Sequence, residues 1–341
     1  MIHLRIIAPT YECENVLDLL EATPSVTNLI FLPGAARKPE GNVVLCDVAR
    51  EDASVVIGDL KELNIHREGS IAIEEIDSQL SVVADEAEKA AAGAPSDAVV
   101  WEEVEARTSE NTELSANFVA FMVLAMLIAA SGIFLDSTIL IIGAMVVGPE
   151  FGPLAGLCVA AVQRRPDVAK RSLAALAVGF PAGILAAFAF SLIVKETGLE
   201  PSGFTVGENS FTQFISQPDA FSVIVAFFAG MAGVLSLTST KSGALIGVLI
   251  SVTTIPAAAN IGLAAAYGDG SELTGALTQL GLNLVAIVLA GIGTLYVQRL
   301  LYMRRRRKHL DDEAREVAGL PKGHSRNPRR RPAPARGSRV K

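Results

Sequence analysis

The sequence has 341 residues, of which 50% are hydrophobic and 19% are charged, and its mean hydropathy is +0.42. Soluble domains carry more charge, on the order of a quarter of their residues. The charge is also segregated: residues 1–116 hold 8 Lys or Arg against 23 Asp or Glu, residues 117–303 hold 7 against 9, and residues 304–341 hold 14 against 4. A single soluble globule is excluded, and we expect an acidic domain, an apolar block and a basic tail in series.

The first 76 residues alternate between strand-like and helix-like apolar patterns. Their four expected strands and two expected helices lie at 2–8, 12–22, 26–32, 42–48, 53–63 and 65–73. The order βαββαβ is that of a ferredoxin-like α+β domain, which we expect to be regulatory. No basic leader with a cleavage site is present in 1–9, so this domain is expected to stay in the cytoplasm.

Residues 77–116 are acidic and rich in alanine, and Gly93-Ala94-Pro95 interrupts them. The stretch 97–114 is compatible with a polar helix that leads into the apolar block. We therefore expect a helical stalk or linker at 77–116.

The chain from Asn117 onward meets the length and hydropathy requirements for membrane helices. A helix needs about 20 apolar residues to cross some 30 Å of hydrocarbon, and it satisfies its own backbone amides there. The candidate spans are 117–135, 137–162, 171–194, 220–237, 242–267 and 273–301. We predict an α-helical integral membrane domain of six spans over residues 117–303.

Basic residues gather in alternate loops of this domain. The loops after spans two, four and six carry Arg164, Arg165, Lys170, Arg171, Lys241 and the run Arg304 to Lys308. The intervening loops are acidic. The positive-inside rule then predicts a multi-pass protein of a bacterial plasma membrane with both termini in the cytoplasm.

Two sequence features of the first three spans recur about a hundred residues later. Leu135-Asp136-Ser137-Thr138 is echoed by Leu237-Thr238-Ser239-Thr240, and Gly152-Pro153-Leu154-Ala155-Gly156 by Ile255-Pro256-Ala257-Ala258-Ala259. The two triplets of spans would then form a 3+3 inverted repeat, as in many secondary transporters. A shared Ala/Gly-rich composition is the alternative explanation.

Spans two and five contain residues that interrupt a helix. They are Gly148, Pro149, Gly152 and Pro153 in span two, and Thr253, Thr254 and Pro256 in span five. Proline removes an amide donor, and the carbonyls it frees at bilayer depth need protein, water or an ion. Matching interruptions predict a substrate or ion site between the two spans, whereas packing kinks are the alternative.

Glu150 lies between the two prolines of span two. A carboxylate at that depth costs on the order of 3 kcal/mol on insertion scales, so we expect it to face a cavity and to act as a proton or cation site. A tilt that brings it to the headgroups is the alternative. Asn260 in span five is a further site candidate, whereas Asn283 in span six is expected to hydrogen-bond between helices.

The segment Ile141-Ile142-Gly143-Ala144-Met145-Val146-Val147-Gly148-Pro149-Glu150-Phe151-Gly152-Pro153-Leu154-Ala155-Gly156 resembles the signature of a family of bacterial membrane proteins known as domain of unknown function 389. Its members share an IGAM segment, a Gly/Pro-rich break and a small-residue helix. The resemblance covers the six spans, and the N-terminal domain is similar to that of one subgroup. It implies no substrate, and many members have an apolar residue where Glu150 stands.

The combined pattern favours a polytopic membrane transporter or channel-like protein of unknown solute. A membrane-anchored ligand sensor or oligomeric scaffold is the alternative, for which deletion of 1–76 would abolish function and Glu150→Gln would be silent. An intramembrane enzyme would need a second catalytic group opposite Glu150, and the spans offer none, so we expect no enzymatic activity. We also expect no cofactor and no metal site, because Cys13, Cys46 and Cys158 are isolated.

The expected partners are membrane lipids, an unknown small solute or ion, and further copies of this chain. The basic tail, residues 304–341, is expected to be disordered in the cytoplasm. Arg304 to Lys308 adjoin span six, where anionic lipid attracts basic side chains. A nucleic-acid partner is not favoured, although for 326–341 lipid contact, RNA or ribosome contact and no contact at all stay open.

Overall fold

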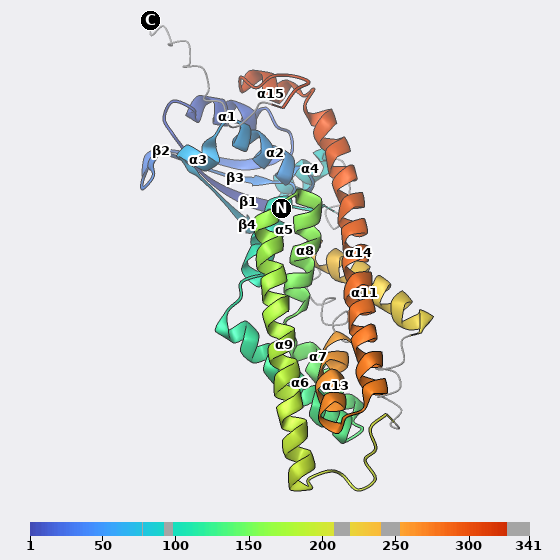
Figure 1. Cartoon of the computed structure of the whole chain (residues 1–341). Coiled ribbons are helices and arrows are strands. Elements are labelled where there is room, and N and C mark those ends of the chain that lie inside the picture. The colour runs from blue at the N-terminus through green and yellow to red at the C-terminus, as the bar shows by residue number, and fades with distance from the viewer. Residues whose placement is uncertain (77, 92–97, 208–218, 240–252, 326–341) are drawn as a thin grey trace, which may run out of the picture. The chain divides into compact units, whose positions relative to one another are not determined.

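The computed structural model describes residues 1–76, 78–91, 98–207, 219–239 and 253–325, and Figure 1 shows their helices and strands. They divide into two compact units. Unit 1 combines Met1–Glu103 with the chain from Gln298 onward, and unit 2 is Val104–Val297. Both ends of the sequence therefore contribute to unit 1.

Unit 1 is built on a four-stranded antiparallel sheet in the order β2-β3-β1-β4. Its elements are β1 (Ile2–Ala8), α1 (Cys13–Glu21), β2 (Val26–Arg37), β3 (Glu40–Val48), α2 (Arg50–Glu62), the single turn α3 (Ile65–Glu68) and β4 (Ser70–Glu75). The predicted order βαββαβ is confirmed. Alternate residues of β1, Ile2, Leu4 and Ile6, are fully buried in one core with residues of α1 and α2.

Two strand boundaries differ from the prediction. The strand expected at 26–32 continues through Pro33 and Gly34 to Arg37, with a register shift between Leu32 and Ala36. The irregularity lies on an edge strand, where a proline removes no bond from the interior of the sheet. The strand expected from residue 65 begins only at Ser70, because α3 follows Asn64, whose φ of 64° is left-handed.

The segment predicted to be a stalk is partly packed on unit 1. It contains α4 (Val82–Ala90), which contacts β2, and α5 (Trp101–Asn111). Val100 is fully buried in the core of unit 1, and Arg50 Nε donates to the Ala98 carbonyl at 3.2 Å. The described residues up to Glu103 are thus part of this unit, whereas Gly93-Ala94-Pro95 lies outside the described residues.

The segment after the last membrane helix is ordered as far as residue 325, which corrects the prediction of disorder from residue 304. The helix α14 (Gly270–His309) continues past the expected end at Leu301, and a short helix α15 (Glu313–Val317) follows and packs against α1. Ala318 and Leu320 join the core of unit 1. The predicted disorder of 326–341 falls outside the described residues.

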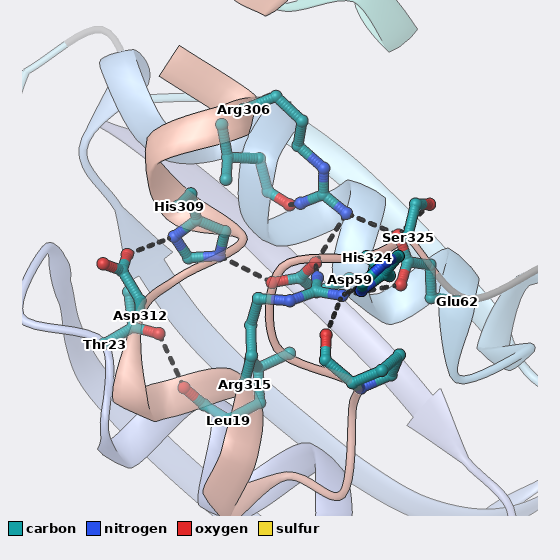
Figure 2. Close-up of polar contacts among 12 residues, drawn as sticks. Leu19, Thr23, Asp59, Glu62, Arg306, His309, Asp312, Arg315, His324 and Ser325 are labelled. Atoms are coloured by element: carbon teal, nitrogen blue, oxygen red, sulfur yellow. Dashed lines mark hydrogen bonds and ion pairs between the residues drawn. The ribbon is translucent and has the colours of Figure 1, made fainter. Parts of the chain in front are cut away.

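Two carboxylates on α2, Asp59 and Glu62, hold this C-terminal segment (Figure 2). Arg315 is fully buried, pairs with Asp59, and donates to Glu62 Oε2 at 2.9 Å. Arg306 reaches the same pair, at 2.6 Å from Asp59 Oδ1 and 2.8 Å from Glu62 Oε1. His309 Nε2 lies 2.6 Å from Asp59 Oδ2. Side chains that follow the membrane domain in sequence therefore neutralise acidic groups near the start of the chain.

Unit 2 is helical. Besides the first part of α14 it contains α6 (Ala116–Phe134), α7 (Thr138–Val147), α8 (Phe151–Gln163), α9 (Pro166–Thr197), α11 (Ala220–Thr238) and α13 (Thr254–Tyr267). In the described part of the chain, four helices are long and apolar enough to cross a membrane: α6, α9, α11 and α14. The bent pair of α7 and α8 adds a fifth if the two helices form a single span. Of the predicted span 242–267, residues 242–252 lie outside the described residues.

The long helix α9 is the element on which α6, α8 and α13 pack. Small residues allow these close contacts: a Cβ at Gly179 would lie 2.8 Å from Phe118 on α6, and a Cβ at Gly262 would lie 2.6 Å from the Ile184 carbonyl of α9. Close approach at glycine is a common way for membrane helices to associate. The packing places the start of α13 beside α7.

Candidate functional site

The predicted interruption of span two is confirmed. The helix α7 ends at Val147, α8 begins at Phe151, and their axes differ by 48°. Pro149 explains the break, because a residue that precedes proline avoids the helical region, and Gly148 is extended with φ −64° and ψ 127°. Pro153 lies in the first turn of α8, where a missing N–H leaves no hydrogen bond unmade.

The helix α13 begins in the same way as α8. Pro256 is its third residue, just as Pro153 is the third residue of α8. Thr253 precedes the helix with φ −84° and ψ 38°, and its side chain makes no capping hydrogen bond. The path of span five before Thr253 lies outside the described residues.

The two helix starts meet at Glu150. Thr254 Oγ1 donates a hydrogen bond of 2.7 Å to Glu150 Oε1, across 104 positions of sequence. Gly148 is part of the same contact, because a Cβ there would clash with the Glu150 carboxylate and lie 2.7 Å from Ile255 Cγ1. The structure thus brings together Gly148, Glu150 and Thr254, which the sequence predicted to share a site.

Glu150 is buried with one oxygen unused. Its residue exposure is 5%, and within the described ranges Oε2 has no hydrogen-bond partner. No ion pair with a basic side chain is found for it in that part of the chain. The N-terminal ends of α8 and α13 lie at this point, and their partial positive charge stabilises a carboxylate. The free oxygen is therefore an available acceptor in an apolar surrounding.

A second group of polar side chains adjoins Thr253. Asn283 Nδ2 on α14 donates to Thr253 Oγ1 at 2.9 Å, so Asn283 links two helices as expected. Gln279 Nε2 lies 3.5 Å from the same hydroxyl and 3.4 Å from Asn283 Oδ1. Since Thr253 and Thr254 are adjacent, this amide pair lies one residue away from the partner of Glu150.

Asn260 is fully buried but does not join Glu150. Its Nδ2 donates to Glu272 Oε2 at 3.2 Å, halfway along α13 and about two turns from Thr254. Pro153 and Pro256 are buried, and Pro149 and Gly152 are half-buried. These last four residues shape the backbone and offer no side-chain hydrogen bond to a ligand.

Two polar residues of this region, Glu272 and Gln279, were not predicted to be site residues. Glu272 was assigned to an acidic loop, although it is 9% exposed and lies inside α14. The signal that could have identified both is their spacing from Asn283. Positions 272, 279 and 283 recur at helical intervals and so share one side of α14.

Comparison with known proteins identifies a similar family whose description names no activity. Residues 145–289 match the family model described as a domain of unknown function, DUF389. An uncharacterized protein of the archaeon Methanocaldococcus jannaschii is 26% identical over 194 residues, which cover 57% of this chain and 58% of that protein. This chain therefore aligns with less than two thirds of that relative. No solved structure matches this chain.

The matched segment contains the α7–α8 break, all of α13 and the first half of α14. The bacterial origin that the resemblance implied is not supported, because the relative is archaeal. Residues 145–289 are therefore similar to the DUF389 family, and this match covers less than half of the chain.

Proposed function

We propose that this protein is a membrane transporter or channel-like protein that binds its solute or coupling ion at Glu150. The observation that carries the proposal is the hydrogen bond from Thr254 to Glu150. It joins two proline-marked helix starts from distant parts of the sequence around a buried carboxylate. The other oxygen of that carboxylate is free among the described residues.

The energetic cost of burying the Glu150 carboxylate favours a functional role for this residue over a structural one. A carboxylate within apolar helices costs on the order of 3 kcal/mol, and such residues in membrane proteins commonly mark ion or substrate pathways. A purely structural carboxylate would be expected to use both oxygens, because each unsatisfied buried acceptor costs about 1–3 kcal/mol. A cation or a hydrogen-bond donor bound at Oε2 would remove that cost.

The architecture we infer is a 3+3 inverted repeat of six spans with both termini in the cytoplasm. The equivalent positions of Pro153 and Pro256 in the first turns of α8 and α13 support the repeat. Secondary transporters use such paired, discontinuous helices to build a site near the bilayer midplane. Unit 1, with its ferredoxin-like βαββαβ order, would then be the regulatory domain.

The proposal is tested with the full-length protein in proteoliposomes, by measuring flux across a panel of ions and metabolites. Glu150→Gln is expected to lower the flux about tenfold or more, which corresponds to about 1.4 kcal/mol or more. Asp136→Asn is the matched control, because Asp136 is an exposed carboxylate in the turn between α6 and α7. Absence of any flux that Glu150 controls, in protein that is folded and inserted, would refute the proposal.

A further inference from the structure

One side of α14 carries three buried polar side chains. Glu272, Gln279 and Asn283 are 9%, 1% and 2% exposed. Their spacing of seven and four residues keeps them on one side of the helix, over a rise of about 16 Å. The same side also carries the buried apolar residues Ala276 and Leu280. We call these three residues the α14 polar face.

The α14 polar face pairs with α13 at two levels. At one level Asn260 of α13 donates to Glu272. At the other, Thr253 at the start of α13 receives hydrogen bonds from Asn283 and Gln279. Thr253 and Asn260 are seven residues apart, about 10 Å along a helix, which matches the separation of Gln279 and Glu272. Hydrogen bonds thus join the two helices at two levels about 10 Å apart, which we call the polar seam, and its inner level adjoins Thr254, the partner of Glu150.

Three oxygens along this seam lack a partner in the part of the chain that the structure describes: Asn260 Oδ1, Gln279 Oε1 and Glu150 Oε2. All three belong to side chains that are at least nine-tenths buried. All three are acceptors, so the group that satisfies them must be a cation or a hydrogen-bond donor. Each would otherwise cost about 1–3 kcal/mol.

The charge at the inner end of the seam matches a monovalent ion. Glu150 supplies one carboxylate at its inner end, and the neighbouring ligands are neutral amide and hydroxyl oxygens. In the described residues, no group of three or more His, Cys, Asp or Glu side chains converges. Divalent cations favour several carboxylates, whereas one carboxylate balances one positive charge in an apolar surrounding.

The outer end of the seam is acidic rather than basic. Asp269 Oδ1 accepts the backbone N–H of Glu272 at 3.0 Å, in the turn between α13 and α14. The nearby cation Lys195 is held elsewhere: its Nζ donates to the Ala266 carbonyl at 3.2 Å and lies 5.0 Å from the centre of the Tyr267 ring. Glu272 can therefore attract a cation to the seam.

We propose that the seam between α13 and α14 binds a dehydrated alkali-metal cation and conducts it from Glu272 to Glu150. The proposal rests on the proposed function and specifies the class of ion and its route. The Gln279 carbonyl and the Thr253 hydroxyl supply neutral oxygen ligands beside the Glu150 carboxylate. A proton alone would need only the carboxylates and would leave the amide oxygens unsatisfied.

Binding of radioactive sodium to the purified full-length protein in detergent tests this inference without a flux measurement. Gln279→Met removes the free oxygen at similar volume, and it is expected to raise the Kd for Na⁺ about tenfold, a loss of about 1.4 kcal/mol. Thr278→Val, on the exposed side of α14, is the control and should leave the Kd unchanged. Wild-type affinity in Gln279→Met would overturn the inference.

A second variant separates loss of a ligand from misfolding. Gln279→Glu adds a carboxylate to the seam and should increase the affinity for Ca²⁺ relative to Na⁺, a gain that a misfolded protein would not show. An unchanged ion preference would contradict the seam as the site. Protonation that depends on pH but not on Na⁺ or K⁺ would show that the seam carries protons only, and would also overturn the inference.

The two proposals fail in different ways. Binding of Na⁺ that depends on Gln279, without any flux in proteoliposomes, would refute the transport function and retain the ion site. Flux that depends on Glu150, without Na⁺ or K⁺ binding, would retain the transport function and refute the cation seam.

Discussion

Asp59 and Glu62 illustrate how single residues decide whether a buried charge is tolerated. Both lie on α2, Asp59 fully buried, and both are paired with the guanidinium groups of Arg306 and Arg315. Two positive and two negative charges balance in a largely buried region. Removal of one partner of such a pair destabilises strongly because the remaining charge stays buried.

Arg315→Met is therefore expected to lower the unfolding free energy of unit 1 by about 3–5 kcal/mol. Thermal unfolding of the full-length protein in detergent, followed by the signal of the N-terminal sheet, measures the effect. Lys322→Met is the control, because Lys322 pairs with Glu316 at 3.0 Å on the surface, and such pairs contribute about 0–1 kcal/mol. Equal effects of the two substitutions would contradict the structure.

Glu51 is a buried acid whose carboxylate, unlike those of Asp59 and Glu62, has no partner among the described residues. Both of its carboxylate oxygens lack a partner in the described ranges, and burial raises the pKa of its carboxyl group. A raised folded-state pKa stabilises the protein at low pH, and this contribution is lost as the pH rises through that pKa. Glu51→Gln should thus raise the melting temperature at pH 7–8, whereas near pH 4 the variant and the wild type should melt alike.

Melting curves at several pH values check this expectation. A benefit of Glu51→Gln that is independent of pH would show that desolvation of the charge is not its cause.

At the scale of elements, the sequence identified the apolar helices and the break in span two because both depend on local chemistry. Length and hydropathy define a span, and Pro149 alone prevents a continuous helix. The extension of α14 to His309 was not predictable in that way. It depends on ion pairs between Arg306 and residues that lie far away in the sequence.

The contact between α13 and α9 gives a prediction at this scale. A Cβ at Gly262 would lie 2.6 Å from the Ile184 carbonyl oxygen and 2.7 Å from the Phe188 nitrogen, both backbone atoms of α9. Gly262→Ala should therefore push the helices apart and destabilise unit 2 by about 1–3 kcal/mol.

Gly143→Ala on α7 is the matched control, since a Cβ there would meet nothing within 4 Å. The melting temperatures of the two variants in detergent compare them directly. A Gly262→Ala variant as stable as Gly143→Ala would show that α13 does not pack closely on α9.

At the scale of the whole molecule, composition alone separated a membrane domain from an acidic N-terminal domain. It did not show that the C-terminal segment completes unit 1, because a stretch rich in Arg and Lys has the composition of a disordered tail. What orders residues 304–325 is a set of acidic partners on α2 and apolar contacts of Leu320, and neither is visible in local sequence.

The residues of the candidate site likewise divide into those that local sequence predicts and those that depend on tertiary contacts. Gly148, Glu150 and Thr254 could be predicted, because interrupted helices and an intramembrane acid are local signals. Gln279 and Glu272 could not be assigned before their hydrogen-bond partners Thr253 and Asn260 were known, because the role of a polar residue in a helix depends on the groups that it contacts. Asn260 was predicted to join the site, but its side chain contacts Glu272 at the outer end of the seam and not Glu150.

The most direct measurement is an experimental structure of the full-length protein in Tl⁺, a monovalent cation whose anomalous scattering locates it without ambiguity. We predict an anomalous peak between Glu150 Oε2, Gln279 Oε1 and the Thr253 hydroxyl, which disappears in Glu150→Gln crystals. A continuous α7–α8 helix, or a fully packed seam between α13 and α14 with no peak, would contradict a cation site at the meeting point of the two helix starts.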